Sequence, residues 1–413
     1  MSRRTARKFE SMKGLFSFHS RFVFALAFAP IFFTGIGAEA KEERWVGTWA
    51  ASPQLTEPAN TPPPPGLTDA TLRQIVHVSL GGKRIRVRFS NAFGSKPLKI
   101  LAARVAASNR GSQIEPETDK PLTFGDRVSI VIPPGAMMIS DPLDFNLACL
   151  SNLAVTIHVN DPTQSITGHP GSRCTSYLDV GDQTKAHDLP RAVSVLHWYY
   201  LCGVDVEAPD AQSYSVAVLG DSITDGRGSP TDGDGRWTDH LARRLQQKQA
   251  VFHVGILNQG LGGNRLLNDG LGPNAIARLD RDVLAQPGIR ALIVFEGIND
   301  LGTRSATATE IINAYNQIII RAHDHNLRIY GATITSCEGS FYFRAELEAD
   351  RQKINAWIRE SGRFDAVIDF DAATRDPVKP SRLSTAVDGG DHLHPGAEGY
   401  KNMANAVALD LFK

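Results

Sequence analysis

The sequence predicts an α/β protein with two folded domains, in which an all-β, sandwich-like domain precedes a flavodoxin-like three-layer α/β/α domain on a parallel five-stranded sheet. Three observations predict this architecture. The chain has 413 residues, which is enough for two cores. Apolar residues alternate with polar ones in its first half, whereas buried runs alternate with amphipathic stretches in its second half. We therefore predict a signal peptide over 1–40, a β-domain over 41–210 and an α/β domain over 211–413.

The N-terminus has the pattern of a secretory signal. Basic residues between positions 3 and 21 precede an apolar run over 22–37, and Ala38-Glu39-Ala40 follows it. This order predicts export with cleavage after Ala40, so we expect a secreted or periplasmic protein. An uncleaved membrane anchor is the alternative, but Pro30 interrupts a run that is shorter than the ~20 residues of a spanning helix. We expect no stable membrane insertion.

The net charge of the chain narrows the range of partners. The chain carries 44 basic and 44 acidic residues, so its net charge does not favour nucleic acid, and we expect none as a partner.

Export would place the cysteines in an oxidising compartment. Cys149, Cys174, Cys202 and Cys337 allow three pairings. We expect a bridge between Cys174 and Cys202, with four buried free thiols as the alternative, and the spacings match no zinc site.

Between residues 45 and 209 the apolar pattern has a period of two. Apolar side chains take every second position in four segments, 76–80, 84–89, 128–132 and 153–159. Such alternation predicts antiparallel strands with one buried face, and no helical period occurs in this region. Five aromatic residues here allow two interpretations, a sugar-stacking surface or part of the core: Trp45, Trp49, Trp198, Tyr199 and Tyr200.

From residue 213 onward apolar runs alternate with amphipathic stretches. Strands are expected over 215–220, 251–257, 290–296, 328–335 and 365–371. Helices are expected over 236–249, 274–286, 307–325, 344–360 and 396–411. Thr307 and Glu310 form a capping-box pattern at the start of the third helix. This alternation predicts right-handed crossovers and a parallel sheet that is covered on both faces.

Polar residues follow the ends of these strands. Ser222 comes just after an apolar run, at the rim where parallel sheets bind ligands, and is the candidate nucleophile. His394 is the candidate base, because a neutral imidazole can take the hydroxyl proton near pH 7. Asp391, three residues earlier, can orient that imidazole. Attack on an ester creates an oxyanion, for which the backbone N–H groups of Ser222 and Gly263 and the side-chain amide of Asn299 are candidate donors.

Four stretches carry a resemblance to a known family: Gly220-Asp221-Ser222-Ile223, the glycine-rich loop 258–264, Gly297-Ile298-Asn299-Asp300 and Asp391-His392-Leu393-His394-Pro395. They resemble the four blocks of the SGNH hydrolases, the GDSL-type lipase and acylhydrolase family, over about residues 213–413. A β-domain followed by such a hydrolase is also similar to a group of secreted bacterial GDSL-type esterases. The resemblance implies the same roles for the triad Ser222, Asp391 and His394, and for Gly263 and Asn299 in the oxyanion hole. Gly260 and Gly262 compete with Gly263 for its role, and His392 competes with His394.

These residues predict a metal-independent serine esterase that needs no cofactor and cleaves carboxylic esters through an acyl-enzyme. We expect short acyl groups on a small-molecule or carbohydrate ester, including acetyl esters of carbohydrates, because the sequence has no long apolar lid segment. A lipase or lysophospholipase of the same mechanism is the first alternative, and a non-catalytic glycan-binding protein is another. A two-metal phosphoesterase is the remaining alternative, with these residues as its site: Asp221, Asp225, Asn299, Asp300, His392 and His394.

Overall fold

The structure of the chain is a computed structural model that describes residues 43–413 apart from 109, 162–164 and 249–252. The predicted signal peptide over 1–40 and its cleavage after Ala40 lie outside the described residues. Residues Glu43–Lys413 form one compact unit. Among the helices described, none is both long enough and apolar enough to cross a bilayer.

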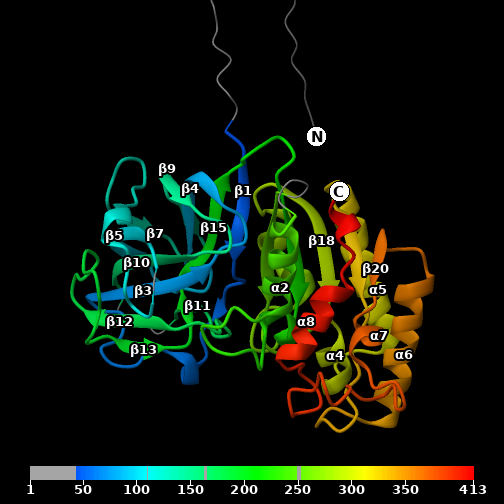
Figure 1. Ribbon diagram of the computed structural model, residues 1–413. Helices are drawn as coiled ribbons and strands as arrows, with labels where there is room; N and C mark the ends of the chain where they lie inside the picture. The colour runs from blue at the N-terminus through cyan, green and yellow to red at the C-terminus, as the bar shows by residue number, and fades with distance from the viewer. Residues whose placement is uncertain (1–42, 109, 162–164, 249–252) are drawn as a thin grey trace, which may run out of the picture. The chain divides into compact units, whose positions relative to one another are not determined.

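Antiparallel strands make up the first part of this unit (Figure 1). They are β1 (Trp45–Ala50), β2 (Gln54–Leu55), β3 (Ala70–His77), β4 (Gly82–Ser90), β5 (Leu98–Ala107), β6 (Lys120–Pro121), β7 (Ile130–Ile132), β8 (Met137–Ile139), β9 (Leu143–Leu147), β10 (Asn152–Asn160), β11 (Thr167–His169), β12 (Ser176–Val180), β13 (Val193–Val195), β14 (Trp198–Tyr199) and β15 (Leu201–Glu207). Their sheets have the orders β1-β15-β4-β8, with β9 also on β4; β13-β12-β3-β10-β5-β6, with β7 also on β5; and β14-β11-β2. The predicted β-rich character is confirmed.

The strand expected over 76–80 lies earlier in the chain, at Ala70–His77, and it is buried on both faces. Thr71, Arg73 and Gln74 are buried together with their apolar neighbours. The Arg73 guanidinium donates hydrogen bonds to Thr156 Oγ1 at 2.9 Å and to the Ala186 carbonyl at 2.6 Å. A guanidinium can be buried at little cost only where its N–H groups find acceptors. The loop that carries Ala186 therefore contacts the side chain of Arg73 and helps to cover it.

The five aromatic residues of the β-rich part belong to its core, and the interpretation of them as a sugar-stacking surface is wrong. Trp45, Trp49, Trp198, Tyr199 and Tyr200 are each 9% exposed or less. The rings of Trp49 and Trp198 meet edge to face with centroids 4.8 Å apart. Buried rings of this kind stabilise the fold and offer no platform to a ligand.

The expected disulfide between Cys174 and Cys202 is also wrong. The two thiols point to different partners, since Cys174 Sγ lies 3.3 Å from the Ile75 carbonyl and Cys202 Sγ lies 3.4 Å from the Arg88 carbonyl. Burial raises the pKa of the Cys202 thiol to about 12, so it stays protonated at neutral pH.

The second part of the unit is built on a parallel sheet. Its strands are β16 (Tyr214–Gly220), β17 (Val254–Gly260), β18 (Ile289–Phe295), β19 (Arg328–Ala332) and β20 (Ala366–Ile368). Their order is β17-β16-β18-β19-β20, and each neighbouring pair is parallel. The predicted parallel five-stranded sheet is confirmed. The carboxyl ends of β16, β17 and β18 therefore meet at one rim.

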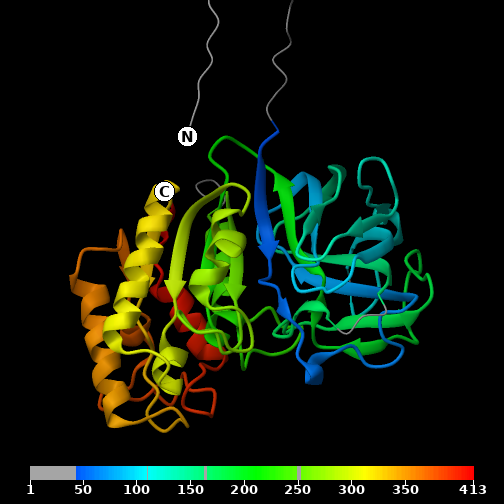
Figure 2. The same cartoon turned by 180° about the vertical axis from the view of Figure 1, so that it is seen from behind.

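Helices cover both faces of this sheet (Figures 1 and 2). They are α1 (Ser222–Asp225), α2 (Trp237–Gln246), α3 (Ala275–Leu279), α4 (Ile298–Thr303), α5 (Ala308–Asp324), α6 (Ala345–Glu360), α7 (Phe370–Thr374) and α8 (Ala397–Ala406). Leu292 of β18 packs in one apolar cluster with side chains of α3, α5 and α6. Its neighbour Ile293 packs in another with side chains of α2 and α8. Successive strand residues point to opposite faces, so both faces of the sheet are buried.

Some predicted boundaries shift by a few residues. Strand β20 ends at Ile368 instead of 371, because Asp369 accepts a hydrogen bond from the Ala372 N–H at 3.0 Å and starts α7. The capping box before α5 is confirmed: the Glu310 N–H donates to Thr307 Oγ1 at 3.3 Å, and the Thr307 N–H donates to Glu310 Oε2 at 2.8 Å.

The β-rich part packs directly against the parallel sheet through β1 and β17. A Cβ added to Gly255 would lie 2.0 Å from the Gly47 carbonyl oxygen, so the two backbones approach too closely for a side chain. Ser79 Oγ accepts a hydrogen bond from the Ile256 N–H at 2.9 Å. Ser52 Oγ donates to Gln259 Oε1 at 2.7 Å. Residues of the β-rich part thus reach the rim of the parallel sheet.

Candidate active site

Ser222 is the first residue of the short helix α1, which follows β16 after a sharp turn. Asp221 caps this helix, since its Oδ1 accepts a hydrogen bond from the Ile223 N–H at 2.9 Å. A Cβ on Gly220 would lie 2.2 Å from Thr224 Oγ1, so the turn admits only glycine there. The side chain of Ser222 is 8% exposed. The sequence thus places a nearly buried hydroxyl at a strand end.

A chain of hydrogen bonds joins Ser222 to the C-terminal loop. Ser222 Oγ lies 2.8 Å from His394 Nε2, and His394 Nδ1 lies 2.6 Å from Asp391 Oδ2. The other oxygen of Asp391 accepts hydrogen bonds from the N–H groups of Leu393 and His394 at 3.0 and 2.8 Å. With the ring proton on Nδ1, toward the carboxylate, Nε2 is left to accept the serine proton. The geometry is that of a nucleophile, a base and a residue that orients the base.

The electrostatic environment keeps His394 neutral. Burial lowers the pKa of His394, the hydrogen bond and charge of Asp391 oppose this, and the charges of Arg227 and Arg173 lower it further, so the pKa lies below its ordinary value of 6.5. Burial raises the pKa of Asp391, but hydrogen bonds from His394 and Leu393 outweigh it, and the net pKa is lowered. At neutral pH the pair is therefore an uncharged imidazole beside a carboxylate.

His392, which competes with His394 on sequence alone, lies in a different environment. Its Nδ1 is 2.5 Å from Asp388 Oδ2, and its side chain is exposed. The structure therefore joins Ser222 to His394, while His392 belongs to a separate surface pair.

The glycine-rich loop after β17 contains a turn that closes with a hydrogen bond from the Asn264 N–H to the Leu261 carbonyl at 3.1 Å. Gly263 has φ of 67°, a conformation that favours glycine. Gly260 does not fit the oxyanion role, because its N–H donates to Asn258 Oδ1 at 2.9 Å. A Cβ on Gly262 would meet no atom within 4 Å, so the surrounding structure does not require a glycine at this position, whereas the positive φ of Gly263 favours one.

Asn299 lies in α4, directly after β18, and its side-chain amide is held on both sides. Nδ2 donates to Asp221 Oδ2 at 3.1 Å and to the Asn264 carbonyl at 3.0 Å. Oδ1 accepts a hydrogen bond from the hydroxyl of Tyr342 at 3.0 Å. Both N–H groups already have acceptors, so an oxyanion would share or replace one of them. Sequence reasoning missed Tyr342, which has no motif around it.

Arg278 is buried next to these loops and donates several hydrogen bonds there. Sequence reasoning also missed this residue. Its guanidinium donates to the Gly220 carbonyl at 3.0 Å, to Asn264 Oδ1 at 2.8 Å and to Ser52 Oγ at 2.8 Å. Its partner Glu296, at 3.4 Å, is also fully buried, and burial raises the pKa of Glu296 well above its ordinary value. Arg278 therefore ties the end of β16 to the glycine-rich loop and to the β-rich part.

Two further carboxyl groups near the site have raised pKa values. Burial raises the pKa of Asp221 to about 7, assisted by the negative charges of Asp300 and Asp225 and opposed by the Ile223 N–H. Burial raises the pKa of Asp300 to about 6, against hydrogen bonds from the N–H groups of the loop that begins at Leu266. These groups support the loops around Ser222 through hydrogen bonds.

The β-rich part contributes a histidine that the sequence did not indicate. His169 Nε2 lies 2.9 Å from Asp225 Oδ1, at the end of α1. His169 Nδ1 lies 2.9 Å from the Ser52 carbonyl. Arg173 Nη2 lies 3.4 Å from the second oxygen of Asp225. The helix α1, which begins at Ser222, is therefore held from the β-rich part as well as from its own sheet.

The alternative two-metal set is not brought together. Asp225 faces His169, Asp300 accepts the Leu266 N–H at 2.9 Å, and His392 pairs with Asp388. Within the described ranges, no group of three or more His, Cys, Asp or Glu side chains is placed to hold a metal ion.

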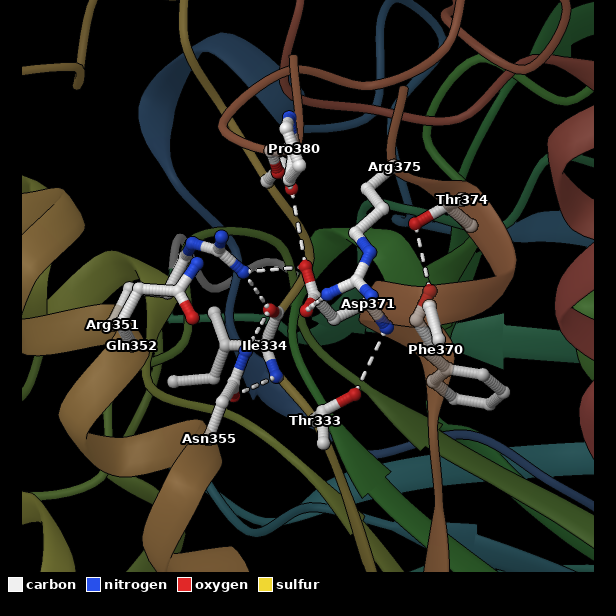
Figure 3. A network of polar contacts seen from close by, with 12 residues as sticks. Thr333, Ile334, Arg351, Gln352, Asn355, Phe370, Asp371, Thr374, Arg375 and Pro380 are labelled. Carbon is white, nitrogen blue, oxygen red and sulfur yellow. Dashed lines mark hydrogen bonds and ion pairs between the residues drawn. The ribbon is translucent and has the colours of Figure 1, made fainter. Parts of the chain in front are cut away.

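A buried polar network holds the chain directly after β19, at Thr333 and Ile334 (Figure 3). Arg351 of α6 donates to the Ile334 carbonyl and to Asp371 Oδ1, both at 2.7 Å. Asn355 donates to the same Ile334 carbonyl at 2.8 Å, and the Asp371 N–H donates to Thr333 Oγ1 at 2.9 Å. The backbone directly after β19 is thus fixed by hydrogen bonds to α6 and α7.

Comparisons with known proteins found similar solved structures and a family match over part of the chain. Solved structures with similarity to this chain include a carbohydrate acetylesterase from Sinorhizobium meliloti, which is 18% identical and matches over 48% of this chain and 98% of its own, with a TM-score of 0.39. A member of the lipolytic protein G-D-S-L family from Veillonella parvula is 20% identical and matches over 48% of this chain and 98% of its own, with a TM-score of 0.38. No curated protein matches the chain. Residues 218–401 match the GDSL-like Lipase/Acylhydrolase family, so this part of the chain is similar to that family.

Proposed function

We propose that this protein is a serine esterase that cleaves carboxylic esters through an acyl-enzyme. The observation that carries the proposal is the continuous chain from Ser222 Oγ to His394 Nε2 at 2.8 Å and from His394 Nδ1 to Asp391 Oδ2 at 2.6 Å. A serine hydroxyl becomes a useful nucleophile only when a base takes its proton, and this geometry supplies the base and fixes its tautomer.

The residues act in two half-reactions. Ser222 Oγ attacks the ester carbonyl carbon while His394 Nε2 takes its proton, and the carbonyl oxygen becomes an oxyanion. The N–H groups of Ser222 and Gly263 and Nδ2 of Asn299 are its proposed donors. His394 then gives the proton to the leaving alcohol, and the C–O bond of the ester breaks. In the second half, His394 takes a proton from water, the water oxygen attacks the acyl group, and the acid leaves as Ser222 regains its proton.

The proposed substrates carry short acyl groups, including acetyl groups on carbohydrates. Leu271, which is 58% exposed, has its Cδ1 3.5 Å from where a Cβ on Gly263 would stand. Phe341, which is 76% exposed, lies with its ring centroid 4.3 Å from that of Tyr342, the partner of Asn299. These apolar groups lie beside the proposed oxyanion donors and would contact the first carbons of an acyl chain. A lipase acting on long chains is the alternative that acyl-chain length tests.

We also propose that the protein is exported and acts without a metal ion. Export is supported by the basic, apolar and Ala-x-Ala pattern that ends at Ala40. Metal independence is supported by the triad itself, because His394 and the three proposed donors supply the base and the charge stabilisation that the reaction needs.

The test is hydrolysis of 4-nitrophenyl acetate, butyrate and palmitate by the mature protein, with and without EDTA. We expect activity that survives EDTA, falls with chain length and is lost in Ser222→Ala. Ser194→Ala, which changes an exposed serine on β13, is the matched control and should behave as the unchanged protein. Activity that persists in Ser222→Ala but is lost with EDTA would overturn the triad, and a preference for palmitate would favour the lipase alternative.

A further inference from the structure

Arg227 lies in the turn between the nucleophile helix and the histidine loop. Its N–H donates to the Ser222 carbonyl at 2.9 Å. A Cβ on the next residue, Gly228, would lie 3.5 Å from the carbonyl oxygen of Pro395, the residue after His394. The backbone of Arg227 is therefore fixed between the segments that carry the nucleophile and the base. Its side chain is exposed.

A second arginine comes to the same place from the β-rich part. Arg173 Nη2 lies 3.4 Å from Asp225 Oδ2, three residues after the nucleophile. Asp225 also faces His169 at 2.9 Å, so it does not serve Arg173 alone. Arg173 Nε is buried and has no hydrogen-bond partner among the described residues. The guanidinium therefore has donor capacity that the protein does not use.

The two arginines make the surroundings of the base positive. Both guanidinium charges lower the pKa of His394, after the larger effects of burial and of Asp391. Among the residues described, no carboxylate forms an ion pair with Arg227. The carboxylate of Asp391 already has partners, because it faces the His394 ring and accepts hydrogen bonds from two backbone N–H groups. Arg173 shares Asp225 with His169, and an anion of the substrate would supply the counter-charge that Arg227 lacks.

The position of the arginines decides which part of the ester they would contact. His394 Nε2 gives its proton to the leaving oxygen, so the alcohol part must lie on the histidine side of Ser222. The acyl oxygen must face the proposed donors on the other side, Gly263 and Asn299. Groups beside His394 therefore contact the alcohol part and leave the acyl part free.

We propose that the alcohol part of the substrate carries an anionic group, a carboxylate or a phosphate, that binds Arg227 and Arg173. This inference rests on the proposed esterase function and adds a substrate class to it, the O-acyl esters of acidic alcohols, of which an acylated acidic sugar is an example. Guanidinium groups match the paired oxygens of both anions. The β-rich part thereby takes part in substrate selection through Arg173.

The test compares three acetate esters with similar phenol leaving groups: neutral 4-acetoxybenzamide, 4-acetoxybenzoate and 4-acetoxyphenyl phosphate. We expect kcat/KM to be about 10- to 100-fold higher for at least one anionic ester than for the neutral ester, as charge-assisted hydrogen bonds allow. The ratio should fall as salt rises from about 0.05 to 0.5 M, because salt screens exposed charges. Arg227→Gln and Arg173→Gln should each reduce the ratio, and Arg227→Lys should restore part of it.

Arg191→Gln is the matched control, because Arg191 is an exposed arginine of the β-rich part outside the proposed site. It should leave the ratio unchanged. Preference for the benzoate would assign a carboxylate, and preference for the phosphate ester would assign a phosphorylated alcohol. Ser222-dependent hydrolysis with equal kcat/KM for all three esters would overturn this inference and leave the proposed function standing. Absence of Ser222-dependent hydrolysis of every ester would overturn both.

Discussion

Tyr342→Phe tests the geometry around Asn299 most directly. The change removes the hydrogen bond from the Tyr342 hydroxyl to Asn299 Oδ1, which is 3.0 Å long, and keeps the ring, against which a Cβ on Gly302 would come within 2.4 Å. One neutral hydrogen bond contributes about 1 kcal/mol, which corresponds to roughly a fivefold lower kcat. Loss of the whole donor in Asn299→Ala should cost about 10²–10³ in kcat. KM should hardly change, because the acyl oxygen gains its charge only in the transition state.

The assay is steady-state hydrolysis of 4-nitrophenyl acetate by the single and double variants. In the Asn299→Ala background, Tyr342→Phe should have no further effect, since the partner of the hydroxyl is gone. Tyr177→Phe, on β12 in the β-rich part, controls for loss of a phenol elsewhere. A fivefold loss that persists without Asn299, or an effect on KM alone, would refute the positioning role of Tyr342.

Three further predictions follow from the site. On 4-nitrophenyl acetate, His394→Ala should lower kcat by about 10⁴-fold or more, whereas His392→Ala should change it little; the reverse result would assign the base to His392. The acidic limb of kcat/KM for this ester should lie below pH 6.5, because burial lowers the pKa of His394, and Arg227→Gln should move the limb to higher pH by removing a positive charge; a limb above pH 6.5 would contradict this. Asp221 and Asp300 have pKa values raised to about 7 and about 6 from 3.8, so the folded protein binds more protons than the unfolded chain in this range, and the free energy of unfolding in urea should fall as pH rises from about 4 to 7. Asp300→Asn should flatten that slope, and an unchanged slope would contradict the assignment.

Features that depend on neighbours in sequence could be predicted. The apolar runs gave the strands of the parallel sheet to within a few residues, and Thr307 with Glu310 marked the start of α5, because caps and strand burial are local. The topology of a parallel sheet then brings strand ends to one rim, which explains why Ser222 and Asn299 could be expected near each other. Ser222 and His394 are 172 residues apart in the sequence, and only the combination of several motifs, not any single motif, predicted their contact.

Features that depend on distant partners could not be predicted. Arg278 stands in a predicted helix, where an arginine is most often solvated, and only the fold shows that carbonyl and amide oxygens surround it. The sequence does not distinguish whether Trp198 and Tyr199 pack in the core or form a sugar-stacking surface, because composition does not reveal which face of a strand is covered. Cys174 and Cys202 illustrate the same limit, since spacing along the chain does not fix distance in space.

The β-rich part contacts the segments around Ser222 through groups that carry or accept charge. Ser52 Oγ accepts a hydrogen bond from Arg278 at 2.8 Å, and His169 lies 2.9 Å from Asp225. A buried charge that loses a partner costs about 3–5 kcal/mol, a large part of the stability of a typical domain. Arg278 and Asp225 therefore couple the two parts, and the β-rich part cannot be regarded as an independent attachment. Arg173 also reaches Asp225 from the same part, at 3.4 Å, so the end of α1 is held by a second group of the β-rich part.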